Sequence, residues 1–387
     1  MLKRSTAKTQ TIYRSPDHRF TGRIDRRMIT NFDWPLLVII GLFIVIGLIN
    51  LYSATSHDDA HNERFVLQLI WIFVGLVLMV LSLSVNYQIY KNAAYGVMIG
   101  TIVLLLATLI IGYVSHGAKR WLLLGPVRFQ PSELAKLAVV LTLAKYFSEN
   151  AKPFGMRLKD LQWPLALIGG PTLLILMQPD LGTALMILLI ATTMILFVGV
   201  RRRTLIGLSV TGLLILPMMY FFVLQDYQRN RILTLLNPDR DPTGTGWHIR
   251  QSLIAIGSGQ IFGKGWMHGT QTKLDFLPEQ HTDFIFSVLA EEWGFIGGLL
   301  TLALFFILIL LCLNIAMNSK DQFGTLLGVG LTAFIFWHVV VNIGMVLGLL
   351  PVVGVPLPFM SYGRTSLLTM MIAIGMLQNI ASRRYIF

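Results

Sequence analysis

Long apolar stretches alternate with short polar segments along most of the chain. Ten of these stretches have about the ~20-residue length that a helix needs to cross a bilayer: 35–54, 65–84, 93–114, 131–147, 161–178, 182–200, 204–224, 284–313, 323–350 and 365–382. They are continuously apolar rather than alternating, and a helix satisfies its own backbone groups in lipid. The pattern therefore predicts an all-α polytopic membrane protein with ten transmembrane helices.

Composition agrees with this class. Hydrophobic residues make up 55% of the 387 positions and charged residues 13%, with a mean hydropathy of +0.67. Cys312 is the only cysteine, which excludes an intramolecular disulfide and a cysteine metal cluster.

The placement of Lys and Arg predicts the orientation. We divide the chain into a basic N-terminal segment, 1–33, and a transmembrane domain, 34–387, and the former has no signal-peptide pattern. Most basic residues fall on one side when the N-terminus is inside, so both termini are expected in the cytoplasm. The run 131–147 is the most polar of the ten. If it did not cross the membrane, the Arg201 to Arg203 triplet would lie outside, so we keep it as a span.

The net charge of +12 raises the possibility of a nucleic-acid partner. However, the basic residues lie where topology requires them, and no basic face with interleaved aromatic residues occurs outside the apolar runs. We therefore expect no nucleic acid and interpret the charge as anchoring against anionic lipids.

One connection is long: residues 225–283 separate the seventh and eighth spans. Aromatic residues, glycines and short apolar stretches make it too rich for a flexible linker. We expect an ordered extracytoplasmic cap with a short amphipathic helix near 247–257. The sequence GSGQIFGKG within it lacks the glycine spacing and βαβ context of a dinucleotide loop, which favours tight turns.

Polar residues gather at the outer ends of several spans. An ionisable residue inside a span generally faces a cavity or a partner, so these residues are candidates for substrate binding. Trp121 can alternatively be an interfacial anchor. The set is Arg64, Arg120, Trp121, Arg128, Glu133, Lys136 and Asp180.

Purely structural roles stay open for several polar residues. Glu133 and Lys136 are spaced i, i+3 and can pair on one helix face. Asp180 precedes the sixth span, where an N-cap role is as reasonable as a catalytic one. His338 and Asn342 are four residues apart in the ninth span, which favours interhelical hydrogen bonds.

The stretch FLPEQHTDFIFSVLAEEWG is unusually acidic for a chain with 19 Asp and Glu. Asp283 falls where the cap meets the eighth span, and Glu291 follows about 12 Å deeper at a 1.5 Å rise. We expect Glu291 and Glu292 to hold helices together or to line a cavity. Thr282 or Asp283 can alternatively be the N-cap of this helix.

Several motifs together resemble one family. NPDRDPTGTGWHIRQSLIAIGSG, GKGWMHGTQ, LPEQHTDFIFSVLAEEWG, QPSELAKL, QPDLGTA and LLPVVGVPLPFMSYGRTSLL occur in order and are similar to the SEDS family of shape, elongation, division and sporulation proteins. The resemblance runs from about Arg120 to the C-terminus and is greater to the elongation type than to the division type. Arg364, where many relatives have glycine, and the long N-terminus depart from the pattern.

The resemblance implies a peptidoglycan glycosyltransferase that polymerises lipid II on the periplasmic face of the bacterial inner membrane during elongation and rod-shape maintenance. The family's essential aspartate falls on Asp283, its glutamate and lysine on Glu133 and Lys136, and its tryptophan on Trp121. Implied partners are lipid II, the nascent lipid-linked strand, a class B penicillin-binding protein and elongation-complex membrane proteins.

The chemistry of such a transfer needs one base, because a diphosphate leaves as a stable anion. A glycoside hydrolase uses two carboxylates instead. Asp283 is our candidate general base in an inverting transfer that releases undecaprenyl diphosphate. Positive charge for the diphosphate would come from Lys136, Arg120, Arg128, Arg64 or a bound Mg²⁺ or Mn²⁺.

Alternatives of other classes stay open. A lipid II flippase would also need many spans and buried polar residues, but its polar residues should line a path through the bilayer rather than gather at one face. A scaffold would recruit other wall enzymes without chemistry, and a division-type polymerase would differ in its cellular role.

Overall fold

The computed structural model describes residues 32–56, 61–115, 118–125, 127–152, 155–222, 224–242, 244–274, 276–277 and 279–384. The basic segment predicted at 1–33 lies outside this part of the chain, except for its last two residues. Its separation from the transmembrane domain stays a prediction.

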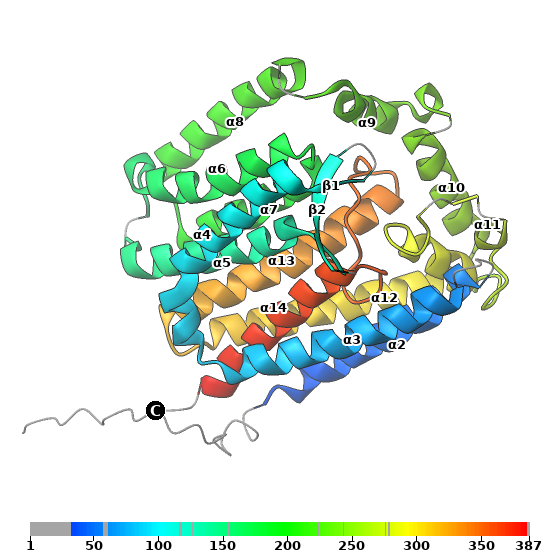
Figure 1. The fold of residues 1–387 in the computed structure, drawn as a ribbon, viewed down its shortest axis with the longest axis horizontal. Helices are drawn as coiled ribbons and strands as arrows, with labels where there is room; N and C mark the ends of the chain where they lie inside the picture. The colour runs from blue at the N-terminus through cyan, green and yellow to red at the C-terminus, as the bar shows by residue number, and fades with distance from the viewer. Residues whose placement is uncertain are drawn as a thin grey trace, which may run out of the picture.

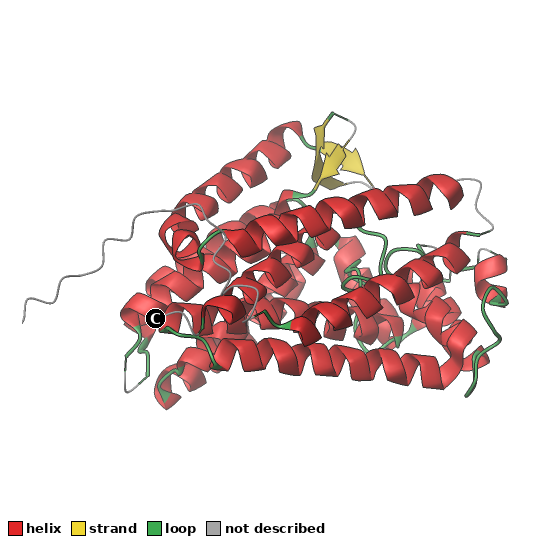
Figure 2. Ribbon diagram, turned by 90° about the horizontal axis from the view of Figure 1, so that it is seen from below, coloured by secondary structure: helices red, strands yellow, loops and turns green. Residues whose placement is uncertain are grey.

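Helices dominate the described chain (Figures 1 and 2). The long ones are α2 (Trp34–Thr55), α3 (His61–Ser84), α4 (Tyr87–Ile111), α5 (Pro131–Asn150), α6 (Gln162–Met177), α7 (Leu181–Val198), α8 (Arg202–Phe222), α12 (Ile285–Met317), α13 (Gln322–Val346) and α14 (Arg364–Arg383). Each corresponds to one of the apolar stretches of the sequence.

Nine helices among the described residues are long and apolar enough to cross a membrane, which confirms a multi-pass membrane protein. The tenth predicted span, 131–147, is α5. Its 20 residues measure about 30 Å, but Glu133, Lys136, Lys145 and Glu149 make it more polar than the other nine. Most of α5 is buried against α4, α7 and α13, so other helices rather than lipid surround Glu133 and Lys136. Glu149 is exposed near the end of the helix and pairs with Lys91.

A small sheet between α4 and α5 was not expected from the sequence. Strands β1 (Tyr113–Ser115), β2 (Ala118–Leu124) and β3 (Val127–Phe129) pair antiparallel in the order β1-β2-β3. The helix predicted to 114 ends at Ile111, because the backbone turns to an extended conformation at Gly112. The sheet carries Arg120 and Trp121 and stands out from the upper side of the bundle in Figure 2.

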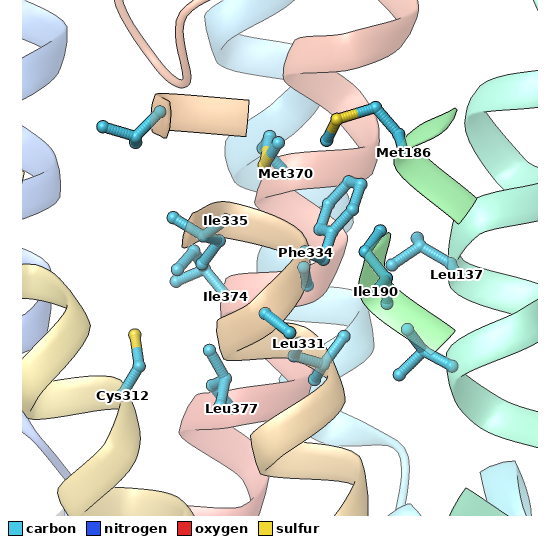
Figure 3. Packing of buried hydrophobic residues seen from close by; sticks show 14 of the residues in the cluster. Leu137, Met186, Ile190, Cys312, Leu331, Phe334, Ile335, Met370, Ile374 and Leu377 are labelled. Atoms are coloured by element: carbon cyan, nitrogen blue, oxygen red, sulfur yellow. The ribbon is translucent and has the colours of Figure 1, made fainter. Parts of the chain in front are cut away.

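The core of the bundle is centred on α13 and α14. In Figure 3 their side chains, among them Leu331, Phe334 and Ile374, interdigitate with residues of α5, α7 and α12. For both helices, 83% of the most apolar window is buried. Polar side chains on α13 are therefore enclosed by protein, where an unpaired hydrogen-bonding group is costly.

Helix α12 is broken near its start. Gly294 has φ 68° and ψ −164°, so the helical hydrogen-bond ladder stops there. A loop of the cap occupies the break: Phe295 N donates to Gln260 O at 2.8 Å and Lys264 N donates to Glu291 O at 3.0 Å. The break leaves these backbone groups paired, as burial requires, and it ties the cap to α12.

The long connection is an ordered cap, as predicted. It contains α9 (Asp226–Leu236), the 3-10 turn η2 (Pro238–Arg240), α10 (Thr245–Ser258) and α11 (Thr270–Lys273), gathered at one end of the bundle (Figure 1). The helix expected near 247–257 is α10. Of the glycines in GSGQIFGKG, Gly257 is in α10, whereas Gly263 and Gly265 form tight turns with φ of 82° and 95°.

Candidate active site

Asp283 lies in the turn immediately before α12. The N-cap of α12 is Phe284, which makes no side-chain capping bond, so the alternative that Thr282 or Asp283 caps this helix is wrong. Thr282 instead donates to the backbone oxygen of Glu279 at 3.2 Å. The Asp283 carboxylate is thus not used for capping and remains available for chemistry.

Two segments enclose the Asp283 residue. A Cβ atom placed on Gly354 would lie 3.3 Å from Asp283 Oδ2, so the carboxylate packs against the backbone that follows α13. On its main-chain side, Asn342 Nδ2 donates to Asp283 O at 2.8 Å. The carboxylate is only partly accessible and lies deep among protein atoms.

This environment changes the acidity of the base. Burial, and to a lesser extent the negative charge of Glu279, raise the pKa of Asp283 to about 7, while the positive charge of Arg231 opposes the rise. Desolvation disfavours the charged carboxylate, which explains the direction. A carboxyl group that titrates near neutral pH suits a general base.

Arg231 of α9 brings a guanidinium from the cap to this carboxylate. Its Nη1 donates to Val352 O at 3.0 Å. Burial and the like charge of Arg120 lower the pKa of Arg231, whereas the charges of Asp180 and Asp283 raise it. Arg231 is therefore within electrostatic reach of one other guanidinium group, Arg120, and of two carboxylates, Asp180 and Asp283.

Arg120 reaches the same region from β2. It donates to the backbone oxygens of Gln178 and Pro179 in the turn between α6 and α7. Tyr227 of α9 donates to the same Pro179 oxygen at 2.8 Å. The sheet, the α6–α7 turn and the cap thus meet at the Pro179 oxygen, and Arg120 donates there to neutral carbonyl groups.

Asp180 is the N-cap of α7, which confirms the N-cap interpretation of this residue. Its side chain accepts from Thr183 N at 3.2 Å and Thr183 Oγ1 at 2.9 Å, and Gln130 Nε2 donates to it at 3.2 Å. Its charge faces Arg231 but its oxygens are already occupied. This favours a supporting role over a catalytic one.

Glu133 and Lys136 form the predicted i, i+3 pair, with Nζ to Oε1 at 2.7 Å. Both are buried, with exposed fractions of 4% and 2%. Lys136 Nζ is also 2.8 Å from His338 Nε2. Since His338 Nδ1 must donate to Phe334 O at 2.7 Å, Nε2 carries the lone pair that accepts from the ammonium group.

This buried network lies beside the base rather than in contact with it. His338 and Asn342 are one turn apart on α13, and the first contacts Lys136 while the second contacts Asp283. The expected interhelical hydrogen bond is confirmed for His338, which contacts Lys136 of α5, but not for Asn342, whose partners lie in a turn and a loop. Lys136 is buried and makes two hydrogen bonds, so direct contact with substrate would require this network to open.

Arg64 and Trp121 are carried by two other elements, α3 and β2. Arg64 is half-buried in the first turn of α3, and Trp121 of β2 pairs with Tyr113 of β1. Arg128 lies over the Tyr113 ring, 5.3 Å from its centroid. The roles of Arg64 and Trp121 in substrate binding stay predictions.

The deeper carboxylates have structural partners, as expected. Glu291 accepts from Lys264 Nζ at 2.6 Å and from Thr270 N at 2.8 Å, which fastens the cap to α12. Glu292 accepts from Ser53 of α2. These two residues hold segments together, so they are not candidates for the base.

Sequence reasoning missed Arg231, Asn342 as a partner of Asp283, and Gly354. Arg231 is one of several basic residues in the long connection, and nothing in its neighbourhood distinguishes it from the others. Gly354 has φ 72°, a left-handed conformation that a lone glycine in PVVGVP could have suggested.

The described residues contain no group of three or more His, Cys, Asp and Glu side chains arranged to hold a metal ion. Protein carboxylates alone therefore do not form a cation cage in this part of the chain. A divalent cation at the site would depend mainly on oxygen atoms from a ligand.

Comparison with known proteins gives consistent matches. Residues 28–386 match the sequence profile FTSW_RODA_SPOVE, described as "Cell cycle protein". The chain is 45% identical over 350 residues to "Peptidoglycan glycosyltransferase MrdB" of Escherichia coli strain K12, covering 90% of this chain and 93% of that protein.

Solved structures agree. One, titled "Structural coordination of polymerization and crosslinking by a peptidoglycan synthase complex", superposes with a TM-score of 0.79 and 31% identity over 92% of this chain and 99% of the other. The crystal structure of the rod-shape-determining protein RodA of Thermus thermophilus superposes with a TM-score of 0.68 and 28% identity, over 92% of this chain and 98% of the other.

Proposed function

The chain belongs to the FtsW, RodA and SpoVE family, and on this premise we propose how it works as a peptidoglycan glycosyltransferase. The reaction joins the disaccharide of lipid II to a lipid-linked glycan strand during cell elongation. The observation that carries the mechanism is the Asp283 carboxyl group, enclosed at the junction of cap and bundle with its pKa raised to about 7.

Asp283 acts as the general base. Its carboxylate takes the proton from the GlcNAc 4-hydroxyl of lipid II as that oxygen bonds to the anomeric carbon of the strand. The bond from that carbon to the diphosphate oxygen breaks, and undecaprenyl diphosphate leaves with the electron pair. Attack opposite the leaving group inverts the anomeric centre, and Asp283 then returns its proton to water.

Arg231 and Arg120 are our candidates for holding the diphosphate. The two like-charged groups are close enough to repel each other, and each donates hydrogen bonds to backbone carbonyl groups. An anion between them would relieve the repulsion and accept charge-assisted hydrogen bonds. Arg guanidinium groups match phosphate geometry well.

Lys136 and Glu133 support this site from α5, within the bundle. Their pairing with each other and with His338 keeps an ammonium group within the bundle near the base-bearing segment. Glu133 neutralises this charge at 2.7 Å, so Lys136 would stabilise the leaving diphosphate only when the network opens. Arg64 and Trp121 stay in the proposal as contacts to the substrate headgroup.

A Mg²⁺ or Mn²⁺ ion is proposed only as a companion of the diphosphate. The described residues do not form an ion site by themselves, and Mg²⁺ commonly binds through substrate phosphates and few carboxylates. When bound, it would neutralise charge on the departing diphosphate.

The setting follows from the substrate. A polyprenyl-linked donor and acceptor stay in the membrane while their sugars meet beneath the cap, which raises their effective concentration. We place the cap on the periplasmic side of the inner membrane, with both termini in the cytoplasm. A class B penicillin-binding protein would crosslink the product, and other elongation-complex membrane proteins would complete the assembly.

The deciding experiment incubates purified protein and its penicillin-binding partner with fluorescent lipid II and Mg²⁺, then separates polymer on a gel. Asp283→Asn keeps the shape of the side chain but removes the base, so we expect polymer from the native protein and none from the variant. Undiminished polymer from Asp283→Asn would overturn the mechanism.

A parallel assay in proteoliposomes separates the flippase alternative. Lipid II that crosses the bilayer without polymer formation would favour a transporter. Polymer formed from lipid II supplied only on the cap side, with no crossing, supports the transferase.

A further inference from the structure

Asn342 is a buried polar residue that the mechanism above does not use. It lies on α13 and has no exposed surface. Its Nδ2 donates two hydrogen bonds, to Asp283 O at 2.8 Å and to Val355 O at 2.7 Å. One side chain from the core therefore links two loop segments that are separate in the sequence.

The chemistry of the contact requires an amide. Both acceptors are backbone carbonyl oxygens, so the NH₂ group and not the oxygen must face them. A carboxylate at position 342 would repel both carbonyl groups. The Oδ1 atom of Asn342 has no hydrogen-bond partner among the described residues, which indicates that the two donated bonds, rather than full satisfaction of the amide, explain its presence.

The second segment held by Asn342 is the wall against which the base packs. Val355 follows Gly354, whose backbone lies against the Asp283 carboxylate. The same segment accepts from Arg231 through Val352 O. Asn342 thus sets the position of the peptide that carries the base relative to the backbone that encloses its carboxylate.

We propose that Asn342 is a positioning residue for the transfer, which fixes the Asp283 main chain and the 352–355 segment in one arrangement. The inference rests on the proposed role of Asp283 as base. Asn342 does not touch the substrate; it acts through the placement of Asp283. A displacement of about 1 Å at a reacting group can reduce the rate about 100-fold.

The chain offers a closely matched control. Asn50 of α2 is also buried, with 1% of its surface exposed, and its Nδ2 donates to Ile285 O at 2.8 Å. Its Oδ1 likewise has no partner among the described residues. Asn50 therefore holds α12 two residues beyond the base, and this bond goes to neither of the two backbone oxygens that Asn342 holds.

The experiment compares Asn342→Leu with Asn50→Leu, since leucine has a similar shape and no donor. Polymerisation of fluorescent lipid II is measured for kcat and KM over pH 5.5–9, and thermal unfolding is measured in detergent. For Asn342→Leu we expect kcat to fall about 100-fold with KM little changed. Asn50→Leu should lose similar stability but keep kcat within a few-fold of the native value.

The pH profile gives a second readout. Glu279 and Arg231 are the charged groups that face Asp283, and neither is substituted in the two variants. A loosened segment admits water to the carboxylate, so the acid limb of Asn342→Leu should move to lower pH. The acid limb of the pH profile of Asn50→Leu should lie at the same pH as that of the native protein.

Equal effects of the two leucine variants on kcat would reduce Asn342 to a structural residue and overturn the proposal, as would a native kcat for Asn342→Leu. If Asn342→Leu does not fold, Asn342→Ser, which keeps one short donor, is assayed in its place and judged by the same criteria. Asp283→Asn is assayed alongside. If it retains activity, the proposed base is wrong; if it is inactive while Asn342→Leu is normal, only the positioning role fails.

Discussion

The side-chain amide of Asn342 on α13 lies 2.8 Å from the backbone oxygen of Asp283. A helix from the centre of the bundle therefore holds the residue at which the cap joins α12. The carboxylate of Asp283 sits at this junction under the influence of a cation from the cap, Arg231. Cap, bundle and base therefore form one structural unit.

Removal of the base should abolish polymerisation without unfolding the protein. General base catalysis contributes about 10²–10⁴-fold, so we expect Asp283→Asn to lose at least 10²-fold in kcat. Thermal unfolding in detergent should be unchanged or improved, because the variant buries no charge. Glu279→Gln, which alters a neighbouring carboxylate, serves as the control and should retain polymer on the gel.

Activity should depend on pH through Asp283. The base works only when ionised, and its pKa is about 7, so the rate should fall as pH decreases through 7. Glu279 raises this pKa and Arg231 lowers it. Glu279→Gln should therefore move the acid limb of kcat to lower pH, and Arg231→Gln should move it to higher pH. Shifts in the opposite directions would contradict the charge arrangement.

The buried pair of Glu133 and Lys136 should be sensitive to loss of one partner. Leaving one buried charge unpaired costs about 3–5 kcal/mol, so Lys136→Met should markedly lower the midpoint of thermal unfolding. The double variant Glu133→Leu with Lys136→Met leaves no unpaired charge and should recover much of that loss. An additive loss in the double variant would argue against a paired network.

The break in α12 should require glycine in the cap loop. A Cβ atom on Gly263 would lie 2.1 Å from Glu292 O, and its φ is 82°, so Gly263→Ala should destabilise the protein by about 1–3 kcal/mol. Gly257 on α10 has no atom within 4 Å of such a Cβ position. Gly257→Ala is the matched control and should be neutral or stabilising by about 0.5–1 kcal/mol. Thermal unfolding of both variants measures the difference.

The sequence by itself determined the fold class. Each apolar run of sufficient length becomes a helix because lipid offers the backbone no other partner, and the runs locate all ten long helices to within a few residues. Local spacing also predicted the Glu133 and Lys136 pair, the N-cap alternative for Asp180 and the helix near 247–257. These features depend on residues close together in the chain.

The tertiary structure decided the remaining features. Asp283 and Asn342 are 59 residues apart. The charge of Arg231 acts on the base from a cap helix, and the charge of Arg120 acts on Arg231 from a strand. The break at Gly294 forms because a distant loop supplies its hydrogen bonds, and the small sheet forms because three short strands pair. No single segment contains this information, since each contact exists only when the helices pack and bring separate segments together.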